Sequence, residues 1–232
     1  MSMRLAVVLP TATPDDTPGE SGGAFVKIDG RESLLRCMEM YVNREGVEQV
    51  IAVVSHESAD DAKRKFGPHF SLSGVKLLTS GAGWFDQLAS AAEKLSADAT
   101  HVVIHDGARP AVPYGDIDAL IEEAASRQAV ALSAPLRSGI VAVDAHGDAK
   151  AYANASDFMQ LLSPQVCTRK AFLRMVETRK PLDAFDLYLV KGSPLNIRVG
   201  GSGDEKLVKA MLGLLPKPKV KGPTNPFEEA QW

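Results

Sequence analysis

The chain has 232 residues, of which 45% are hydrophobic and 24% charged, as in a soluble globular protein long enough to bury a full core. Its formal net charge of -3 argues against a nucleic-acid-binding protein, because such proteins need a basic surface to replace phosphate counterions. The first apolar run, residues 5–9, is too short for a signal sequence or a membrane span. We therefore expect a cytoplasmic protein with neither a nucleic acid nor a membrane as partner.

Short β-branched runs alternate with segments of helical period, which is typical of β-α-β units on a parallel sheet. The predicted strands are residues 4–9, 49–54, 75–78, 101–104 and 129–132. Between them lie three apolar stripes at helical spacing: Leu34, Met38, Tyr41 and Val42; Phe85, Leu88, Ala92 and Leu95; and Ile117, Leu120, Ile121 and Ala124. These stripes predict helix faces that pack on the core.

After Pro135 this rhythm changes, and residues 140–143 and 149–152, joined by a turn at 145–148, predict a β-hairpin that stands off from the main body. An isolated two-stranded ribbon is marginally stable. We therefore expect the arm, residues 138–155, to pack against the same arm of a second subunit and form a homodimer.

The last third returns to the α/β pattern. It predicts a helix near 170–177, strands at 187–190 and 195–199, and a helix over 204–212 with Gly213 as its C-cap. The proline-rich segment from Pro216 onward predicts a flexible, solvated tail. We expect one domain over 1–215 and a tail over 216–232.

The two cysteines, Cys37 and Cys167, belong to no Cys-x-x-Cys or Cys/His pattern. This favours half-buried free thiols in a reducing compartment over a disulfide or a zinc site. We expect no metal site formed by the chain's own residues.

The most informative stretch is His105-Asp-Gly-Ala-Arg-Pro110, which directly follows the predicted strand 101–104. In an open parallel sheet, ligands bind just beyond the carboxyl ends of the strands, where Asp106 and Arg109 would project. Taken alone, Asp106 could instead cap a turn and Arg109 could simply pair with it.

This stretch resembles the His-Asp-Ala-Ala-Arg-Pro segment of the 2-C-methyl-D-erythritol 4-phosphate cytidylyltransferases of non-mevalonate isoprenoid synthesis. Two further segments follow in the same order: Leu162-Ser-Pro-Gln165 is similar to the family's Thr-Pro-Gln, and Asn196-Ile-Arg-Val199 to its Asn-Ile-Lys-Val/Ile-Thr. Each motif is short, so the ordered combination over residues 3–213 carries the resemblance.

The resemblance implies an α/β fold, a Rossmann-like nucleotidyltransferase of three α/β/α layers with a mainly parallel sheet and a projecting β-hairpin arm through which family members dimerise. It implies that a polyol phosphate attacks the α-phosphorus of CTP and releases pyrophosphate, with Mg²⁺ across the triphosphate. Such chemistry depends on positioning and positive charge more than on a protein nucleophile.

The resemblance also assigns candidate site residues. The catalytic candidates are Asp106, Arg109, Arg198 and Lys27. The nucleotide-binding candidates are Pro10, Thr11, Ala12, Gly81, Asp106 and Gly107. The candidates for binding the second substrate are Ser163, Gln165 and Arg198, with Arg198 in the place of a family lysine.

The chain departs from the family where the triphosphate should bind. The family's glycine-rich loop, Ala-Ala-Gly-x-Gly-x-Arg, is replaced by residues 10–18, which contain Asp15 and Asp16 and three prolines without amide donors. Gly22-Gly-Ala24 stands where the family has Pro-Lys-Gln with its catalytic lysine, so that Lys27 is the candidate substitute. Trp84 and Gln87 stand where the family has an arginine and a serine.

Two interpretations therefore remain open. The chain is either a cytidylyltransferase-family enzyme that works through substitute residues, or a catalytically silent homologue kept as a dimeric scaffold or small-ligand-binding protein. In a dimer, Arg137 or Lys150 of a second subunit could supply missing positive charge. A related nucleotide-sugar transferase would need an Asp-x-Asp metal motif, which the spacing Asp183-Ala-Phe-Asp186 does not provide.

Overall fold

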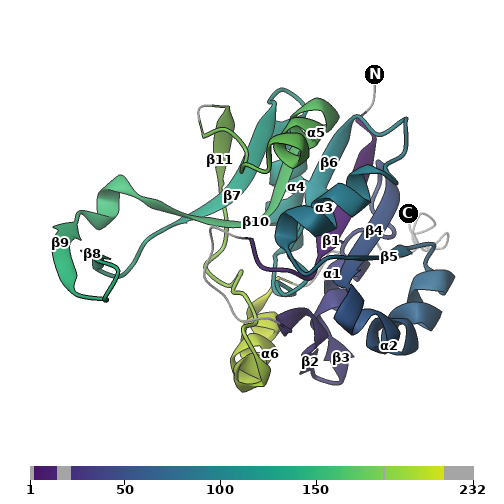
Figure 1. Cartoon of the computed structure of the whole chain (residues 1–232), viewed down its shortest axis with the longest axis horizontal. Helices are drawn as coiled ribbons and strands as arrows, with labels where there is room; N and C mark the ends of the chain where they lie inside the picture. The colour runs from purple at the N-terminus through teal and green to yellow at the C-terminus, as the bar shows by residue number, and fades with distance from the viewer. Residues whose placement is uncertain (1–2, 15–21, 185, 217–232) are drawn as a thin grey trace, which may run out of the picture.

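The computed structural model describes residues 3–14, 22–184 and 186–216. Its centre is a seven-stranded sheet in the order β11-β7-β10-β6-β1-β4-β5 (Figure 1). The strands are β1 (Leu5–Pro10), β4 (Val47–Ser55), β5 (Lys76–Ser80), β6 (His101–Ile104), β7 (Ala129–Pro135), β10 (Met159–Thr168) and β11 (Leu187–Lys191). β10 runs antiparallel to both of its neighbours, and the other pairs are parallel.

Helices cover both faces of this sheet because alternate residues of its buried strands point to opposite sides. Val7 and Leu9 of β1 pack with the helices α1 (Ser33–Glu39), α2 (Ala59–Leu72) and α4 (Tyr114–Ala124). Val8 packs on the other face with α3 (Trp84–Ala92) and α5 (Arg169–Thr178). The predicted three-layer α/β/α architecture is confirmed.

A smaller layer lies beyond the carboxyl ends of the strands. It consists of the hairpin β2 (Lys27–Ile28) and β3 (Arg31–Glu32) and of α6 (Glu205–Leu214), whose contact buries Ile28, Val199 and Val208. Four 3₁₀ turns complete the described structure: Gly23–Phe25, His56–Ser58, Ala155–Asp157 and Ser202–Asp204.

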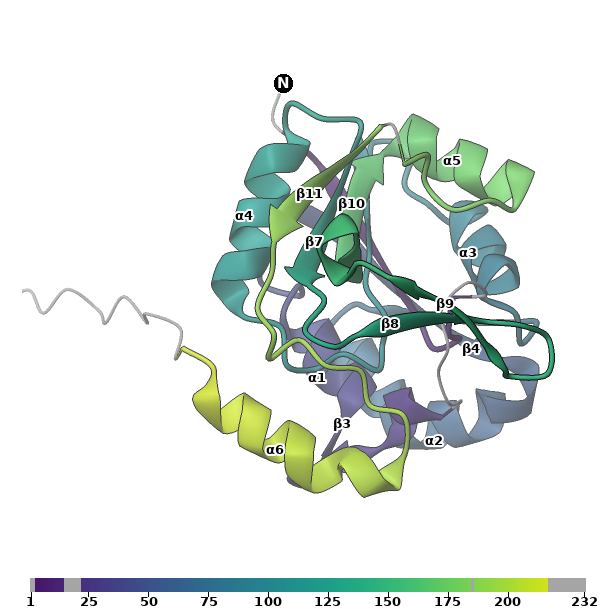
Figure 2. The ribbon, with the colours of Figure 1, turned by 90° about the vertical axis from the view of Figure 1, so that its left-hand side faces the viewer.

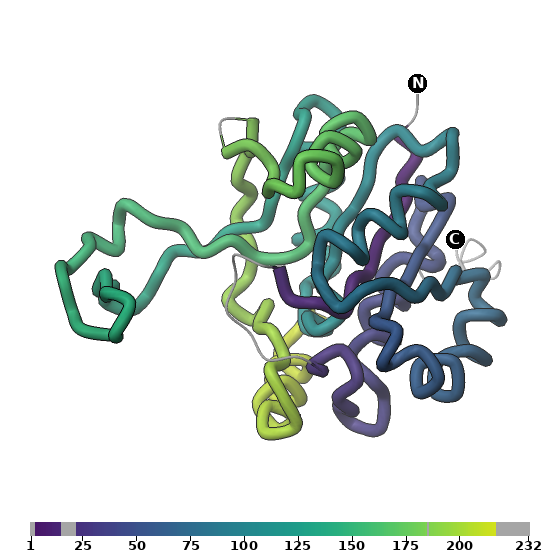
Figure 3. Tube along the Cα trace, in the orientation of Figure 1, coloured from purple at the N-terminus to yellow at the C-terminus, as the bar shows by residue number. Residues whose placement is uncertain are grey.

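The arm is formed by β8 (Ile140–Val143) and β9 (Ala149–Ala153), which pair antiparallel as predicted. Figures 1 and 3 show the chain leaving the body after β7 and returning beside itself into β10, and Figure 2 views the arm from its tip, with β8 and β9 lying across the front of the body. The side chain of Asp144 accepts the amides of His146 and Asp148, and Gly147 adopts a φ of 89°, which suits glycine in a tight turn.

Several predictions about elements were wrong. β10 was not foreseen, because Ser163-Pro164-Gln165 looks like a turn. The structure instead accommodates Pro164, which has no amide to donate, where the register between Leu162 and Gln165 shifts. α2 was also missed, since Pro68 lies inside it and weakens the helical pattern.

The predicted strand 195–199 is an irregular segment. The amide of Val199 donates to the carbonyl of Ala108, as in a sheet. The carbonyl of Asn196 instead accepts from the side chain of Arg109, and the side-chain amide of Asn196 donates to the carbonyl of Ser163. Gly213 does not cap α6 but lies inside it, and the C-cap is Leu215. Cys37 and Cys167 are fully buried rather than half-buried, and both are free thiols. The tail was expected over residues 216–232, of which 217–232 lie outside the described residues, as does the stretch 15–21 with Asp15 and Asp16.

Gly23 provides a stability test of the small layer. A Cβ atom at this position would lie 1.9 Å from the carbonyl oxygen of Val199 and 3.1 Å from the Cβ of Ala108. Because backbone must shift to relieve such a clash, we expect Gly23→Ala to lower the free energy of unfolding by about 2 kcal/mol or more, measured by urea denaturation.

Gly213→Ala is the matched control, since no atom lies within 4 Å of a Cβ built there and the residue is helical. We expect this change to raise stability by about 0.5–1 kcal/mol. Equal stabilities of the two variants would contradict the close packing of Gly23.

Candidate functional site

The site begins where β6 ends, at the junction of three elements. The amide of Gly107 donates to the carbonyl of Pro10 at 2.9 Å, and the hydroxyl of Ser33 at the start of α1 donates to the carbonyl of Gly107 at 2.8 Å. A Cβ on Gly107 would lie 2.8 Å from Leu34 and 3.2 Å from the Pro10 carbonyl oxygen. Only glycine fits this approach without a shift, so Gly107 fixes the ends of β1 and β6 against α1.

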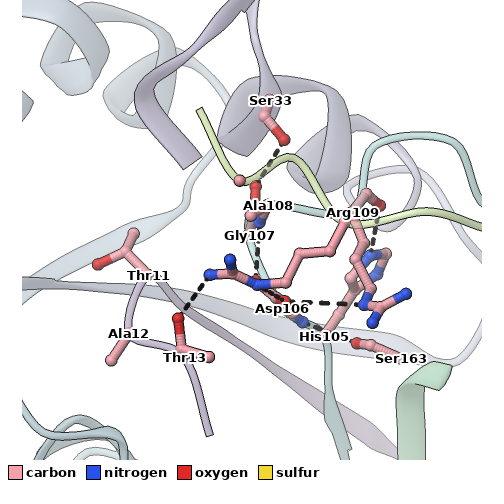
Figure 4. Close-up of polar contacts among 12 residues, drawn as sticks. Thr11, Ala12, Thr13, Ser33, His105, Asp106, Gly107, Ala108, Arg109 and Ser163 are labelled. Atoms are coloured by element: carbon pink, nitrogen blue, oxygen red, sulfur yellow. Dashed lines mark hydrogen bonds and ion pairs between the residues drawn. The ribbon is translucent and has the colours of Figure 1, made fainter. Parts of the chain in front are cut away.

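Asp106 is the centre of the site and is 5% exposed (Figure 4). Its Oδ1 accepts the amide of Ala108 at 2.9 Å, and its Oδ2 accepts the Nε of Arg198 at 2.8 Å. The Nε of Arg109 lies 3.7 Å from the same Oδ2. The carboxylate therefore binds the guanidinium groups of two arginines that lie 89 residues apart in the sequence.

Both arginines carry the network outward from Asp106. Arg109 donates to the carbonyl of Asn196 at 2.8 Å, and Arg198 donates to the hydroxyl of Thr13 at 2.8 Å. Burial lowers the pKa of Arg109, although a guanidinium stays charged at any physiological pH. Two cations thus lie side by side at the edge of the sheet, an arrangement suited to phosphate oxygens.

Ser163 joins β10 to this network. Its hydroxyl accepts the amide of Asp106 at 2.8 Å, and its carbonyl accepts the side-chain amide of Asn196. Asn196 is 2% exposed and links Ser163 to Arg109. Asn196 lies in the motif Asn196-Ile-Arg-Val199 but was not among the predicted site residues, and its position in that motif was the signal that could have identified it.

The side chain of His105 contacts the backbone of the same turn. The ring is fully buried, which lowers the pKa of His105 to about 4, so the imidazole is neutral near pH 7. Its Nε2 lies 2.9 Å from the carbonyl of Arg109, which can only accept, and its Nδ1 lies 2.7 Å from the hydroxyl of Tyr41. The proton is therefore assigned to Nε2, and Tyr41 donates to Nδ1.

The first residues after β1 already have a partner. The Oε1 of Gln87 accepts the amides of Thr11 at 2.8 Å and Ala12 at 3.1 Å, and Gln87 is 1% exposed. The Thr11 hydroxyl donates to the carbonyl of Val53 at 3.0 Å. A side-chain carbonyl oxygen therefore occupies both amide donors of this loop.

Arg109 lines two cavities. One of about 100 Å³ is also lined by Asp106, Ser163, Gln165 and Trp84. The other, of about 710 Å³, lies between the base of the arm and the segment 194–198, and its lining includes Arg109, Arg137 and Arg198. Three arginines facing one hollow make the larger cavity suitable for an anionic ligand.

The structure thus brings most of the predicted residues together. Asp106, Arg109, Arg198 and Ser163 form one hydrogen-bonded network with the loop after β1, which contains Thr11 and Ala12 (Figure 4). Gln165 and Gly107 lie beside it.

Other predicted residues lie apart from this network. Lys27 is exposed on β2, where its ammonium lies 3.7 Å from Glu32, and it lines neither cavity. Gly81 follows β5 and packs against the side chain of Asp86. Lys150 is exposed on the arm.

Among residues 3–14, 22–184 and 186–216, no three acidic, histidine or cysteine side chains gather as a metal-binding group. Over the same residues, none of the helices combines the length and the apolar character needed to cross a bilayer.

The family model and two similar known proteins carry the same description. The family model described as 2-C-methyl-D-erythritol 4-phosphate cytidylyltransferase matches residues 6–213. A protein of that name from Rhodopirellula baltica is 25% identical over 231 residues, which cover 90% of this chain and 94% of that protein. One from Bacillus velezensis is 22% identical over 207 residues, covering 82% and 88%.

Solved structures share the fold. The 4-diphosphocytidyl-2C-methyl-D-erythritol synthase of Anaerococcus prevotii superposes with a TM-score of 0.73 at 17% identity, covering 91% of this chain and 99% of that one. The 2-C-methyl-D-erythritol 4-phosphate cytidylyltransferase of Thermus thermophilus gives 0.67 at 19% identity, covering 91% and 100%. Neither these structures nor the two named relatives support a catalytically silent homologue.

The buried His105 predicts a pH-dependent stability. Its folded pKa of about 4 lies below the ordinary value of 6.5, so the unfolded chain binds the proton more readily between these two values. Stability contributed by the neutral ring is present above pH 6.5 and is lost as the pH falls toward 4. We expect a loss of about 3 kcal/mol over this window, measured by urea denaturation.

In His105→Gln this part of the pH dependence should disappear. His146→Gln, a change at an exposed turn of the arm, should retain it. If His105→Gln showed the same slope as the parent protein, the titration would belong to another group.

Proposed function

This chain belongs to the 2-C-methyl-D-erythritol 4-phosphate cytidylyltransferase family, and we propose that it transfers CMP from CTP to 2-C-methyl-D-erythritol 4-phosphate or a related polyol phosphate. The observation that carries the proposal is the pair of guanidinium groups, Arg109 and Arg198, which converge on Asp106 at the carboxyl edge of the sheet. This edge is where ligands of open α/β sheets bind.

The proposed reaction is a single displacement. A phosphate oxygen of the polyol phosphate attacks the α-phosphorus of CTP, a new P–O bond forms, and the bond from the α-phosphorus to the bridging oxygen breaks to release pyrophosphate. Negative charge accumulates on the leaving pyrophosphate, so fixed cations stabilise the transition state. Arg198 is our main candidate for this role, because its guanidinium lies beside both the loop after β1 and Asp106.

We assign the larger cavity to the polyol phosphate. Arg109, Arg137 and Arg198 line it and can neutralise its phosphate, while Asn196 adds a polar contact. Asp106 orients the two guanidinium groups and can accept a hydroxyl group of a substrate. Ser163 and Gln165 line the adjoining smaller cavity, where we place further hydroxyl contacts.

We assign the nucleotide to Pro10, Thr11 and Ala12 together with Gly81 and Gly107. For the amides of Thr11 and Ala12 to bind it, the carboxamide of Gln87 must first turn away. Lys27 would contribute only after leaving Glu32, a movement that its exposed, flexible side chain permits.

Mg²⁺ is proposed to arrive with the nucleotide. The ion binds oxygen ligands and usually keeps several waters, so phosphate oxygens can hold it with little help from the protein. The residues present fit an ion held mainly by phosphate and water, because Asp106 is the one acidic residue that lines either cavity in the described structure. Bound there, the ion would neutralise charge on the triphosphate.

We place the reaction in the cytoplasm, on the evidence of two buried free thiols.

Replacement of Arg198 tests the assignment of the site. We expect Arg198→Gln to lower kcat/KM by about a hundredfold or more, because a cation facing the developing charge is lost. The measurement is pyrophosphate release from CTP and 2-C-methyl-D-erythritol 4-phosphate in the presence of MgCl₂. Arg198→Lys keeps the charge but loses the planar fork that binds both Asp106 and Thr13, so its activity should lie between those of Arg198→Gln and the parent protein.

Arg64→Gln, at an exposed position on α2, is the control for charge removal. Full turnover by Arg198→Gln would show that the residue only holds the loop in place. Absence of pyrophosphate release from the parent protein would contradict the proposed function itself.

We further propose that the arm forms a homodimer. Apolar side chains of the arm remain exposed in the single chain, Val141, Val143 and Tyr152, as do Phe158 and Met159, which directly follow it. Exposed apolar groups gathered on one projecting ribbon are typical of an interface. A partner arm would also bring charged groups such as Lys150 near a second active site.

Sedimentation velocity tests this interface. We expect Tyr152→Glu, a change in a side chain that is 91% exposed, to convert a dimer into a monomer at micromolar concentration, because the charge would have to be buried. Leu72→Glu, at an equally exposed apolar residue on α2, should leave the dimer intact. A monomeric parent protein would contradict the proposal.

A further inference from the structure

A third cavity lies between α5 and the residues that follow it, 180–183 and Asp186. Its volume is about 490 Å³, and its lining begins at Gln128 and Ala129, where β7 starts. Neither Asp106, Arg109 nor Arg198 lines it. It is therefore separate from the two cavities assigned to the substrates.

The rim of this cavity is basic. Lys170 and Arg174 lie one turn apart on α5, and Lys180 follows the helix. The side chains of these three residues make no hydrogen bond or ion pair with any residue that the structure describes, so each keeps its full capacity to bind an anion. An arginine with two neighbouring ammonium groups suits phosphate in particular.

Several other residues that line the cavity are apolar. Ala129, Ala171, Met175 and Leu182 line it, and Met175 is 3% exposed. Asp183 and Asp186 also line the cavity and would repel a ligand that is anionic along its whole length. The lining therefore fits a ligand with phosphate at one end and an apolar body at the other.

This cavity shares two lining residues with the small cavity beside Asp106. Pro181 and Leu182 line both this cavity and the small cavity beside Asp106. Leu182 packs in one hydrophobic cluster with Met175 of α5 and Trp84 of α3. A ligand that displaces Leu182 would therefore alter the surroundings of Trp84.

We propose that this cavity is a second binding site, specific for a small amphiphilic phosphate whose anionic end binds Lys170, Arg174 and Lys180 and whose apolar body contacts Met175 and Leu182. Binding at this site is transmitted through Leu182 to the small cavity beside Asp106. The binding itself does not depend on the proposed cytidylyl transfer; its effect on the active site rests on that function.

The test uses 3-methylbutyl diphosphate as the probe, with 3-methylbutanol and inorganic pyrophosphate as separate arms. Calorimetry measures binding, and fluorescence of Trp84 measures transmission in a Trp232→Phe background, which leaves Trp84 as the single tryptophan. We expect saturable binding of the alkyl diphosphate with a change in Trp84 emission. We expect the alcohol, which lacks the anion, and pyrophosphate, which lacks the apolar body, to bind at least about tenfold more weakly.

The double variant Lys170→Gln/Arg174→Gln should weaken binding of the alkyl diphosphate by about tenfold or more, while Lys63→Gln, which removes an exposed cation on α2, should not. Absence of binding, or binding that the double variant retains, would overturn the site. Binding without a change at Trp84 would overturn the transmission. None of these readouts requires turnover, so a failure of the proposed enzymatic activity would be recognised separately.

Discussion

The organisation of the catalytic edge depends on the Asp106 carboxylate. Two guanidinium groups in a region that is mostly buried would repel each other, and the carboxylate between them lowers that repulsion. Each contact also anchors a different part of the chain: Arg198 brings the segment after β11 to the loop after β1, and the backbone amide of Asp106 anchors Ser163 of β10. The carboxylate is thus surrounded by donors, which is the condition under which a buried charge is tolerated.

The core and the order of the layers could be predicted from the sequence because both follow from local patterns. The runs at 101–104 and 129–132 are short and apolar, and the structure has strands there. β10 could not be predicted in this way, since Pro164 within it is compatible only with a break in register that tertiary pairing provides. The segment 195–199 alternates like a strand because one side packs on α6 and the other faces the site, and this pattern does not require a ladder.

The site residues that lie in short sequence motifs could be predicted from the sequence. Asp106, Arg109, Ser163 and Arg198 come from three separate stretches, and the strand ends bring them together. The contact between Gln87 and the Thr11 and Ala12 amides was not predictable, since it joins positions more than 70 residues apart through a side-chain conformation. The sequence identified Gln87 only as a position where the family resemblance expects serine.

The loop after β1 is held by distant side chains where the family resemblance expects a glycine-rich backbone. Gln87 fixes its first two amides, and Arg198 fixes the hydroxyl of Thr13. A lysine at position 198 carries a single ammonium group and is a poorer match for both Thr13 and Asp106, because a planar guanidinium presents several donors in fixed directions. The arginine is therefore consistent with a loop that lacks its usual glycines, since one side chain supplies positive charge and also fixes the loop's position. Arg198 thus couples the positive charge of the site to the position of the loop after β1.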